Sequence, residues 1–163
     1  MKLLRRYLSI ICVMLIGFTT LNFGAKALGQ SGVAARDPVA EFADVLPGQP
    51  KSAIVARGFS CPALAYRSPN EHCSLRPKRS AFSHVDVDIV SGRISHSSFN
   101  VRSNLLRVGE LVLLWGIPEI EAGANTVVLR WHRIDTTAIA TSHTGKFSFL
   151  LGVDRLFISA KCC

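Results

Sequence analysis

Four side chains near the middle of the chain have the types and spacing needed for acid–base or metal chemistry. His84, Asp86 and Asp88 alternate with apolar residues, so they share one face of an extended strand. If the chain returns through a three-residue loop at 90–92, His96 lies opposite Asp86. Imidazole and carboxylate groups on adjacent strands could bind a metal ion or act as an acid–base pair. We favour the alternative, a solvated sheet face with a weak cross-strand ion pair, because such a cluster gains reactivity only where a cleft shields it.

An antiparallel hairpin would position these residues. Its first strand has aliphatic residues at 85, 87 and 89, and Gly92 is expected at the left-handed position of the loop. The return strand, from Arg93 to about Val101, then places Phe99 on the apolar face. Three later strands are predicted from alternating or mainly apolar segments of the sequence. They cover 127–132, 136–142, and 147–158 with a break at Gly152.

The stretch from Asn104 to Pro118 predicts a helix. Gly116 stands where a helix C-cap needs positive φ, and Pro118 blocks continuation. The five apolar residues at 111–115 also fit a buried strand, but the helix is favoured. The residues with the i, i+3, i+4 and i+7 spacing of one helix face are Val108, Leu111, Val112 and Trp115.

Two shorter helical segments are expected before the hairpin. Asp37-Pro38 has the features of a helix start, an N-cap acceptor followed by proline at the first helical position, and an apolar stripe follows through Leu46. Residues 51–57 form a further turn or two that Gly58 ends. Residues 59–80 are predicted to be irregular.

The order of these elements indicates an α+β fold. We expect a tandem repeat of a helical segment followed by antiparallel strands, which forms one antiparallel sheet with the helices packed on one face. Repeat one covers about 37–101 and repeat two about 102–160. The turn sequence SGRIS at 91–95 recurs as TGKFS at 144–148.

The first 27 residues predict a secretory signal peptide. Basic residues precede an apolar run at 8–18, and Ala25-Lys26-Ala27 has the small-x-small cleavage pattern. The alternative is an uncleaved N-terminal anchor, which needs about 17–25 apolar residues. Residues 28–36 are expected to be a flexible connector and 37–163 a single domain. We therefore expect a secreted or extracytoplasmic protein that contacts the membrane only through an uncleaved leader.

Export determines how the cysteines are interpreted. Outside the cytoplasm an even count favours disulfides over metal thiolates, so Cys61 and Cys73 are predicted to bridge and to staple a loop. Cys162 and Cys163 could form a vicinal bridge, link two chains or lie in a disordered end. The sequence leaves these three alternatives open.

Half of the net charge of +8 comes from four basic residues of the predicted leader, and the remainder of the chain has a net charge of +4. The one dense basic group, Arg76, Lys78 and Arg79, is too small for a nucleic-acid footprint, and no nucleic-acid partner is expected. This group could contact anionic polymer or lipid headgroups, although a solvated loop is favoured.

The sequence has no motif of a specific enzyme class. It contains no G-x-S-x-G elbow, no P-loop and no G-x-G-x-x-G fingerprint. Trp115 and Trp131 could line a ligand groove, but their apolar spacing favours the core. No cofactor is expected.

The predicted helix and its flank read V-G-E-L-V-L-L-W-G-I-P-E at 108–119, and an L-R-W strand follows at 129–131. With these motifs the chain resembles the tandem αβββ proteins, which include the β-lactamase-inhibitor proteins and the outer-membrane-assembly lipoproteins of the SmpA/OmlA type. It is still more similar to a group of exported bacterial proteins that share V-G-[DE]-L-V-L-L-W-G-x-P-E. The resemblance covers roughly residues 40–158 and implies a fold and a protein-binding habit. The lipoproteins' acylated cysteine is missing, so lipid attachment does not transfer.

We therefore expect an exported, non-enzymatic module that binds or braces another envelope or extracellular protein. The alternative is a small secreted hydrolase or metal-dependent enzyme that uses the face formed by His84, Asp86, Asp88 and His96.

Overall fold

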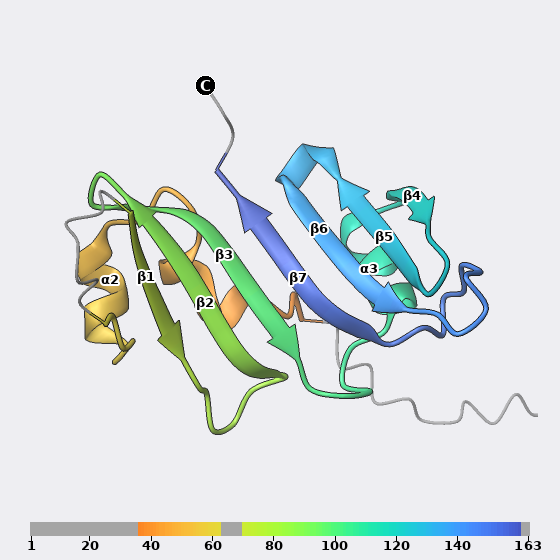
Figure 1. The fold of residues 1–163 in the computed structure, drawn as a ribbon, viewed down its shortest axis with the longest axis horizontal. Helices are drawn as coiled ribbons and strands as arrows, with labels where there is room; N and C mark the ends of the chain where they lie inside the picture. Colours follow the sequence, from red (N-terminus) through yellow and green to blue (C-terminus); the bar gives the residue numbers. More distant parts are fainter. Residues whose placement is uncertain (1–35, 63–69, 161–163) are drawn as a thin grey trace, which may run out of the picture. The chain divides into compact units, whose positions relative to one another are not determined.

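The computed structural model describes residues 36–62 and 70–160, which form one seven-stranded antiparallel sheet with a few short helices (Figure 1). This confirms the predicted antiparallel sheet, and the content of strands and short helices is consistent with the predicted α+β class or with a mostly-β fold. The sheet has the strand order β1-β2-β3-β7-β6-β5-β4. Its strands are β1 (Asn70–Leu75), β2 (Phe82–Val90), β3 (Arg93–Val101), β4 (Glu119–Ala122), β5 (Thr126–Trp131), β6 (Thr136–Thr141) and β7 (Val153–Ser159). The helical segments are η1 (Ala40–Val45), α2 (Lys51–Ala56), α3 (Val108–Trp115) and η2 (His132–Ile134).

The strands divide into two runs of sequence neighbours that meet in the middle of the sheet. β1, β2 and β3 are consecutive on one side, and β7, β6, β5 and β4 follow in reverse order on the other. The two runs join where β3 pairs with β7, which Figure 1 shows as the green and blue strands lying side by side.

Alternation along the strands places one face of the sheet in the hydrophobic core. In β2 the three aliphatic residues Val85, Val87 and Ile89 are buried, as predicted, and in β5 Val127 and Leu129 are buried. The same core includes buried side chains of all three N-terminal and central helical segments, among them Phe42, Ile54 and Leu111. A cluster of three phenylalanine rings, Phe42, Phe82 and Phe99, has centroid distances of 5.0–5.8 Å.

The predicted central helix is confirmed as α3, and Gly116 ends it. Gly116 has φ 86° and ψ −172°, a backbone conformation that is essentially restricted to glycine, although it is not the αL geometry of the usual C-cap. The Gly116 carbonyl accepts a hydrogen bond of 2.8 Å from Trp131 Nε1. Trp131 is buried against the edge of the partly buried Trp115, so the core interpretation of this pair is confirmed.

The loop between β2 and β3 differs from the three-residue loop that the sequence predicts. Val90 pairs directly with Arg93, and the two turn residues Ser91 and Gly92 both have positive φ, 52° and 77°. A two-residue turn of this kind matches the twist of the flanking strands. A register shift after the Ile89–Ile94 pair then restores the alternation, so that Phe99 faces the core as expected.

Two strands lie where no strand is predicted. β1 falls within the region 59–80 that the sequence indicates to be irregular, and β4 is an exposed edge strand of four residues. Both are short and have few buried side chains, so the alternation of apolar residues is too weak to indicate them. Of the last predicted strand, 147–158, only the part from residue 153 onward is strand, as β7, and residues 147–152 form the loop that precedes it.

No helix within residues 36–62 and 70–160 is long and apolar enough to cross a bilayer. The predicted signal peptide at 1–27, nearly all of the connector at 28–36, and Cys162 and Cys163 lie outside the residues that the structure describes.

Candidate functional site

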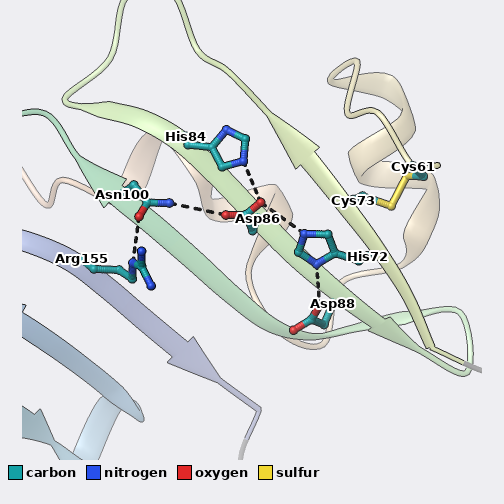
Figure 2. A network of polar contacts seen from close by, with 8 residues as sticks. All are labelled: Cys61, His72, Cys73, His84, Asp86, Asp88, Asn100 and Arg155. Atoms are coloured by element: carbon teal, nitrogen blue, oxygen red, sulfur yellow. Dashed lines mark hydrogen bonds and ion pairs between the residues drawn. A yellow bond between two sulfur atoms is a disulfide. The ribbon is translucent and has the colours of Figure 1, made fainter.

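Three of the four predicted site residues meet on the open face of the sheet, opposite the core. His84, Asp86 and Asp88 point away from the buried aliphatic residues of β2, as their alternation predicts. His84 Nε2 lies 2.9 Å from Asp86 Oδ1 (Figure 2). The exposed fractions of the Asp86 and Asp88 side chains are 21% and 50%, so water reaches both carboxylates.

A fourth member of this group comes from β1 and is absent from the sequence prediction. His72 is the register partner of Asp88, and its ring lies across both carboxylates of β2 (Figure 2). Nδ1 is 2.9 Å from Asp88 Oδ1 and Nε2 is 3.4 Å from Asp86 Oδ1. The available signal was Cys73 beside it, since a cysteine, which is among the most often buried residue types, between two polar residues fits a strand.

His96 is not part of this group, which corrects the predicted register. The shift between β2 and β3 places His96 opposite Asp88, whereas the three-residue loop would have placed it opposite Asp86. Its ring turns toward β7: Nδ1 lies 3.0 Å from Ser159 Oγ, and the ring packs beside Phe157. The two-residue turn shifts the pairing by one position and the extra residue in β3 shifts it by a second, so the predicted pair of imidazole and carboxylate does not form.

The polar contacts continue from β2 across the junction of the two strand runs. Asn100 on β3 donates from Nδ2 to Asp86 Oδ2 at 3.5 Å, and Arg155 on β7 donates from Nε to Asn100 Oδ1 at 2.8 Å. Figure 2 shows the resulting chain of side chains, which runs from β1 to β7. We call the residues His72, His84, Asp86, Asp88, Asn100 and Arg155 the open-face network.

The electrostatics of the open-face network favour a charged imidazole. The hydrogen bond to Asp88 raises the pKa of His72 above its ordinary value of 6.5, partial burial opposes this effect, and the charges of Asp88 and Asp86 add to it. A ring whose two nitrogens both face carboxylates offers neither a free lone pair nor a free N–H to a substrate. His72 is therefore poorly placed to act as a general base.

The same contacts bear on the metal site that the sequence offers as a less favoured interpretation. Within residues 36–62 and 70–160, no group of three or more His, Cys, Asp or Glu side chains is arranged so that it could hold a metal ion. The imidazoles and carboxylates contact one another at the surface, with 54% of the His72 side chain exposed. His84, Asp86 and Asp88 are thus engaged with one another or with His72, and His96 lies apart from them.

A disulfide lies beneath the network on the core side of β1. Cys61 and Cys73 form the predicted bridge, with an S–S distance of 2.03 Å and a Cα–Cα distance of 4.2 Å. Cys73 is fully buried, and the neighbouring segment pairs with β1 through the bridge between Ser60 and Ser74. This disulfide is compatible with an extracytoplasmic location.

An apolar groove lies elsewhere in the molecule, between α3 and the loop before β7. Its volume is about 510 Å³. Leu113, Phe149 and Leu150 line it and have exposed fractions of 85%, 56% and 73%. Gly109 allows the close approach of the two segments, because a Cβ there would lie 3.1 Å from the Phe149 carbonyl oxygen. Three further residues complete the lining: Arg107, Glu110 and Val112.

The predicted basic group lies in the loop between β1 and β2. Arg76, Lys78 and Arg79 are all exposed, which agrees with the favoured interpretation of a solvated loop. Arg102 fixes this loop by donating to the Pro77 carbonyl at 2.8 Å and to the Ser80 carbonyl at 3.2 Å.

No protein-family model, curated protein or solved structure matches this chain. The resemblance to the tandem αβββ proteins therefore stays a prediction, and arguments about function depend on the chain's own surface.

Proposed function

We propose that this protein is an exported, non-enzymatic module that binds another protein of the envelope or extracellular space through the groove beside α3. The observation that supports this most directly is the exposure of Leu113, Phe149 and Leu150 around one groove. Contiguous exposed apolar side chains are uncommon on monomeric proteins and mark interaction sites. The charged residues Arg107 and Glu110 lie beside them, and an apolar centre with a polar rim is the usual composition of a protein interface.

The Cys61–Cys73 bridge supports the extracytoplasmic part of the proposal. Disulfides persist in oxidising compartments and are rare in the cytoplasm. The predicted leader at 1–27 would supply the export route.

The fold behind this module is, in our proposal, a tandem repeat of one unit with a helix followed by three antiparallel strands, to which the second copy adds the short edge strand β4. Equivalent backbone contacts at the start of each helix support it. Pro50 precedes α2 and forms a bridge with Arg93 in the first run of strands, and Arg107 precedes α3 and forms a bridge with Gly152 in the second. The backbone hydrogen bonds of the residues after Arg93 and Gly152 also correspond. Ile94 N donates to Gln49 O, and Val153 N donates to Leu106 O, each at 2.9 Å.

Irregular strand pairing supports the same repeat. In the first run the pair Ile89–Ile94 is followed by Asp88–His96, and in the second the pair Ala140–Val153 is followed by Ile139–Arg155. Each run thus has one extra residue at the same place in its last strand. These pairs align Ile94 with Val153, so the proposed repeat has a different register from the sequence match of 91–95 with 144–148.

A tandem unit of this kind is also what the resemblance to the αβββ proteins implies. We propose that relationship on the motif at 108–119 and on the two corresponding sets of backbone contacts. The buried side chains of η1, α2 and α3 join the core face of the sheet, which fits helices packed on one face.

The open-face network lends no comparable support to the enzyme alternative. Its side chains are partly exposed, they pair with one another, and His96 lies apart from them.

Photo-crosslinking tests the proposed binding site. A benzoylphenylalanine placed at Leu113 in the full chain is expected to crosslink to one discrete envelope or extracellular protein in the producing cells. The same probe at Val55 on α2, which is 60% exposed and outside the groove, is the matched control and is expected to capture no such protein. Leu150→Ser should weaken the Leu113 crosslink, because a lost apolar contact at the centre of an interface that costs about 1 kcal/mol lowers the affinity about five-fold.

Three outcomes would contradict this proposal. The probe at Leu113 recovers only the uncrosslinked monomer, it captures the same proteins as the probe at Val55, or it links two copies of this chain. The last outcome would make the groove an interface between copies.

A further inference from the structure

We propose that His72 is a pH-sensitive clamp: its protonated imidazole holds the edge strand β1 against β2, and its deprotonation loosens that pairing. This device is independent of the groove beside α3.

The clamp follows from the position of one ring between two carboxylates. His72 Nδ1 lies 2.9 Å from Asp88 Oδ1, and Nε2 lies 3.4 Å from Asp86 Oδ1 (Figure 2). A neutral imidazole has one N–H and one lone pair, whereas an imidazolium has two N–H donors. Carboxylates only accept hydrogen bonds, so both contacts are favourable together only while the ring is charged.

Protonated His72 is a major source of positive charge beside Asp86 and Asp88, because the neighbouring charged groups have other partners. On β2, Asp86 also contacts His84 from the other side. On β3, Asn100 gives Asp86 a neutral amide, and His96 turns away to contact Ser159. The other charged groups of the neighbourhood are engaged elsewhere: Glu71 on β1 pairs with Lys51 of α2, and Arg155 of β7 donates to Asn100.

Loss of the proton therefore leaves two carboxylates beside a ring that can donate to only one of them. The pKa of His72 is raised, chiefly by the hydrogen bond with Asp88, so the stabilising effect is fully present below a pH of about 6.5. It is lost as the pH rises through the higher pKa of the folded state. Acidification therefore stabilises the pairing of β1 with β2.

β1 is able to respond because it is an edge strand. Its inner side pairs with β2, and within residues 36–62 and 70–160 its outer side has one bridge, between Ser74 and Ser60. Ser74 N–H donates outward to Ser60 O, so strand alternation directs the N–H groups of Glu71 and Cys73 toward β2. Their hydrogen-exchange protection therefore reports how firmly β1 is paired.

Hydrogen exchange of the folded chain at pH 6.0 and pH 8.0, corrected for intrinsic rates, tests the clamp. We expect protection of the Glu71 and Cys73 amides to be about two- to five-fold greater at pH 6.0, the range of a partly exposed ion pair. His72→Gln should remove this dependence, because glutamine keeps a donor but does not titrate. His96→Gln is the matched control and should keep it, because the His96 ring contacts Ser159 on β7 and lies outside the pair of carboxylates that holds His72.

The pKa of His72 in the wild-type chain, measured by NMR titration of its ring proton, gives a readout that needs no variant. A value above 6.5 is expected. The proposal is overturned if that pKa is 6.5 or lower, if β1 protection does not change between the two pH values, or if His72→Gln retains the wild-type dependence.

Discussion

At the scale of residues, the open-face network shows how strand pairing brings together groups that are distant in the sequence. His72 and Asp88 lie on different strands but are register partners, and residues opposite one another on the same face have side chains in contact range. Because the groups are partly exposed, each pair contributes at most about 1 kcal/mol. The network therefore adjusts the pairing of one edge strand, while the buried face of the sheet provides the stability.

Gly116→Ala tests a single backbone conformation. A Cβ at this position meets no atom within 4 Å, so crowding is not the cause of any effect. The φ of 86° with ψ −172° is unfavourable for alanine, and we expect the free energy of unfolding to fall by about 1–3 kcal/mol. Urea denaturation followed by circular dichroism measures it.

Gly152→Ala is the control, because Gly152 lacks positive φ and a Cβ there would be in ordinary contact, 3.8 Å from Asn104. It should change the stability by no more than about 0.5 kcal/mol. Equal effects of the two substitutions would contradict the role given to Gly116.

At the scale of elements, β1 depends on contacts that lie outside the strand itself. It has only one fully buried side chain, Cys73, and that residue is joined to Cys61. The bond closes a short loop, and Ser60 pairs with the outer side of the strand. The disulfide, the bridge and the clamp at His72 thus act on the same edge element.

Replacement of both cysteines, Cys61→Ala with Cys73→Ala, tests the disulfide. With a sequence separation of 12, loop closure predicts a loss of about 3 kcal/mol in the free energy of unfolding. Thermal or urea denaturation measures this change, and hydrogen exchange should show that β1 loses protection first.

Addition of reductant provides the control for this variant. Reductant should lower the stability of the wild type toward that of the double variant and should leave the double variant unchanged. A wild type that is equally stable with and without reductant would contradict the stabilising role of the bridge.

At the scale of the whole molecule, the two runs of strands share one core. The buried residues of both runs belong to a single cluster, and β3 and β7 join the runs through backbone pairing. A shared core of this kind favours cooperative unfolding of the described domain, since neither run can lose its packing without exposing the other.

Leu129→Ala tests this cooperativity. Leu129 is fully buried in β5, and its truncation should lower the free energy of unfolding by about 2–5 kcal/mol. Native-state hydrogen exchange should show an equal loss of protection in β2, on the far side of the junction. Val55→Ala, at an exposed position, should change neither quantity by more than about 0.5 kcal/mol. Loss confined to β5, β6 and β7 would show that the runs unfold separately.

The sequence by itself determined the strands and helices that bury apolar side chains in a regular pattern. The alternation in β2 and β5 and the helical spacing in α3 are local patterns, and each reflects which side chains avoid water. The positive φ at Gly116 and the pairing of Cys61 with Cys73 were also predictable, because glycine and oxidised cysteine have few other structural uses at such positions.

Only the tertiary structure decided which residues the open-face network contains. The two-residue turn and one extra residue in β3 together move His96 from Asp86 to Asp88, and β1, which the sequence barely indicates, supplies His72. The register between strands depends on turn geometry and on core packing by both partners, so no single segment contains it. The place where imidazole meets carboxylate is therefore a property of the assembled sheet.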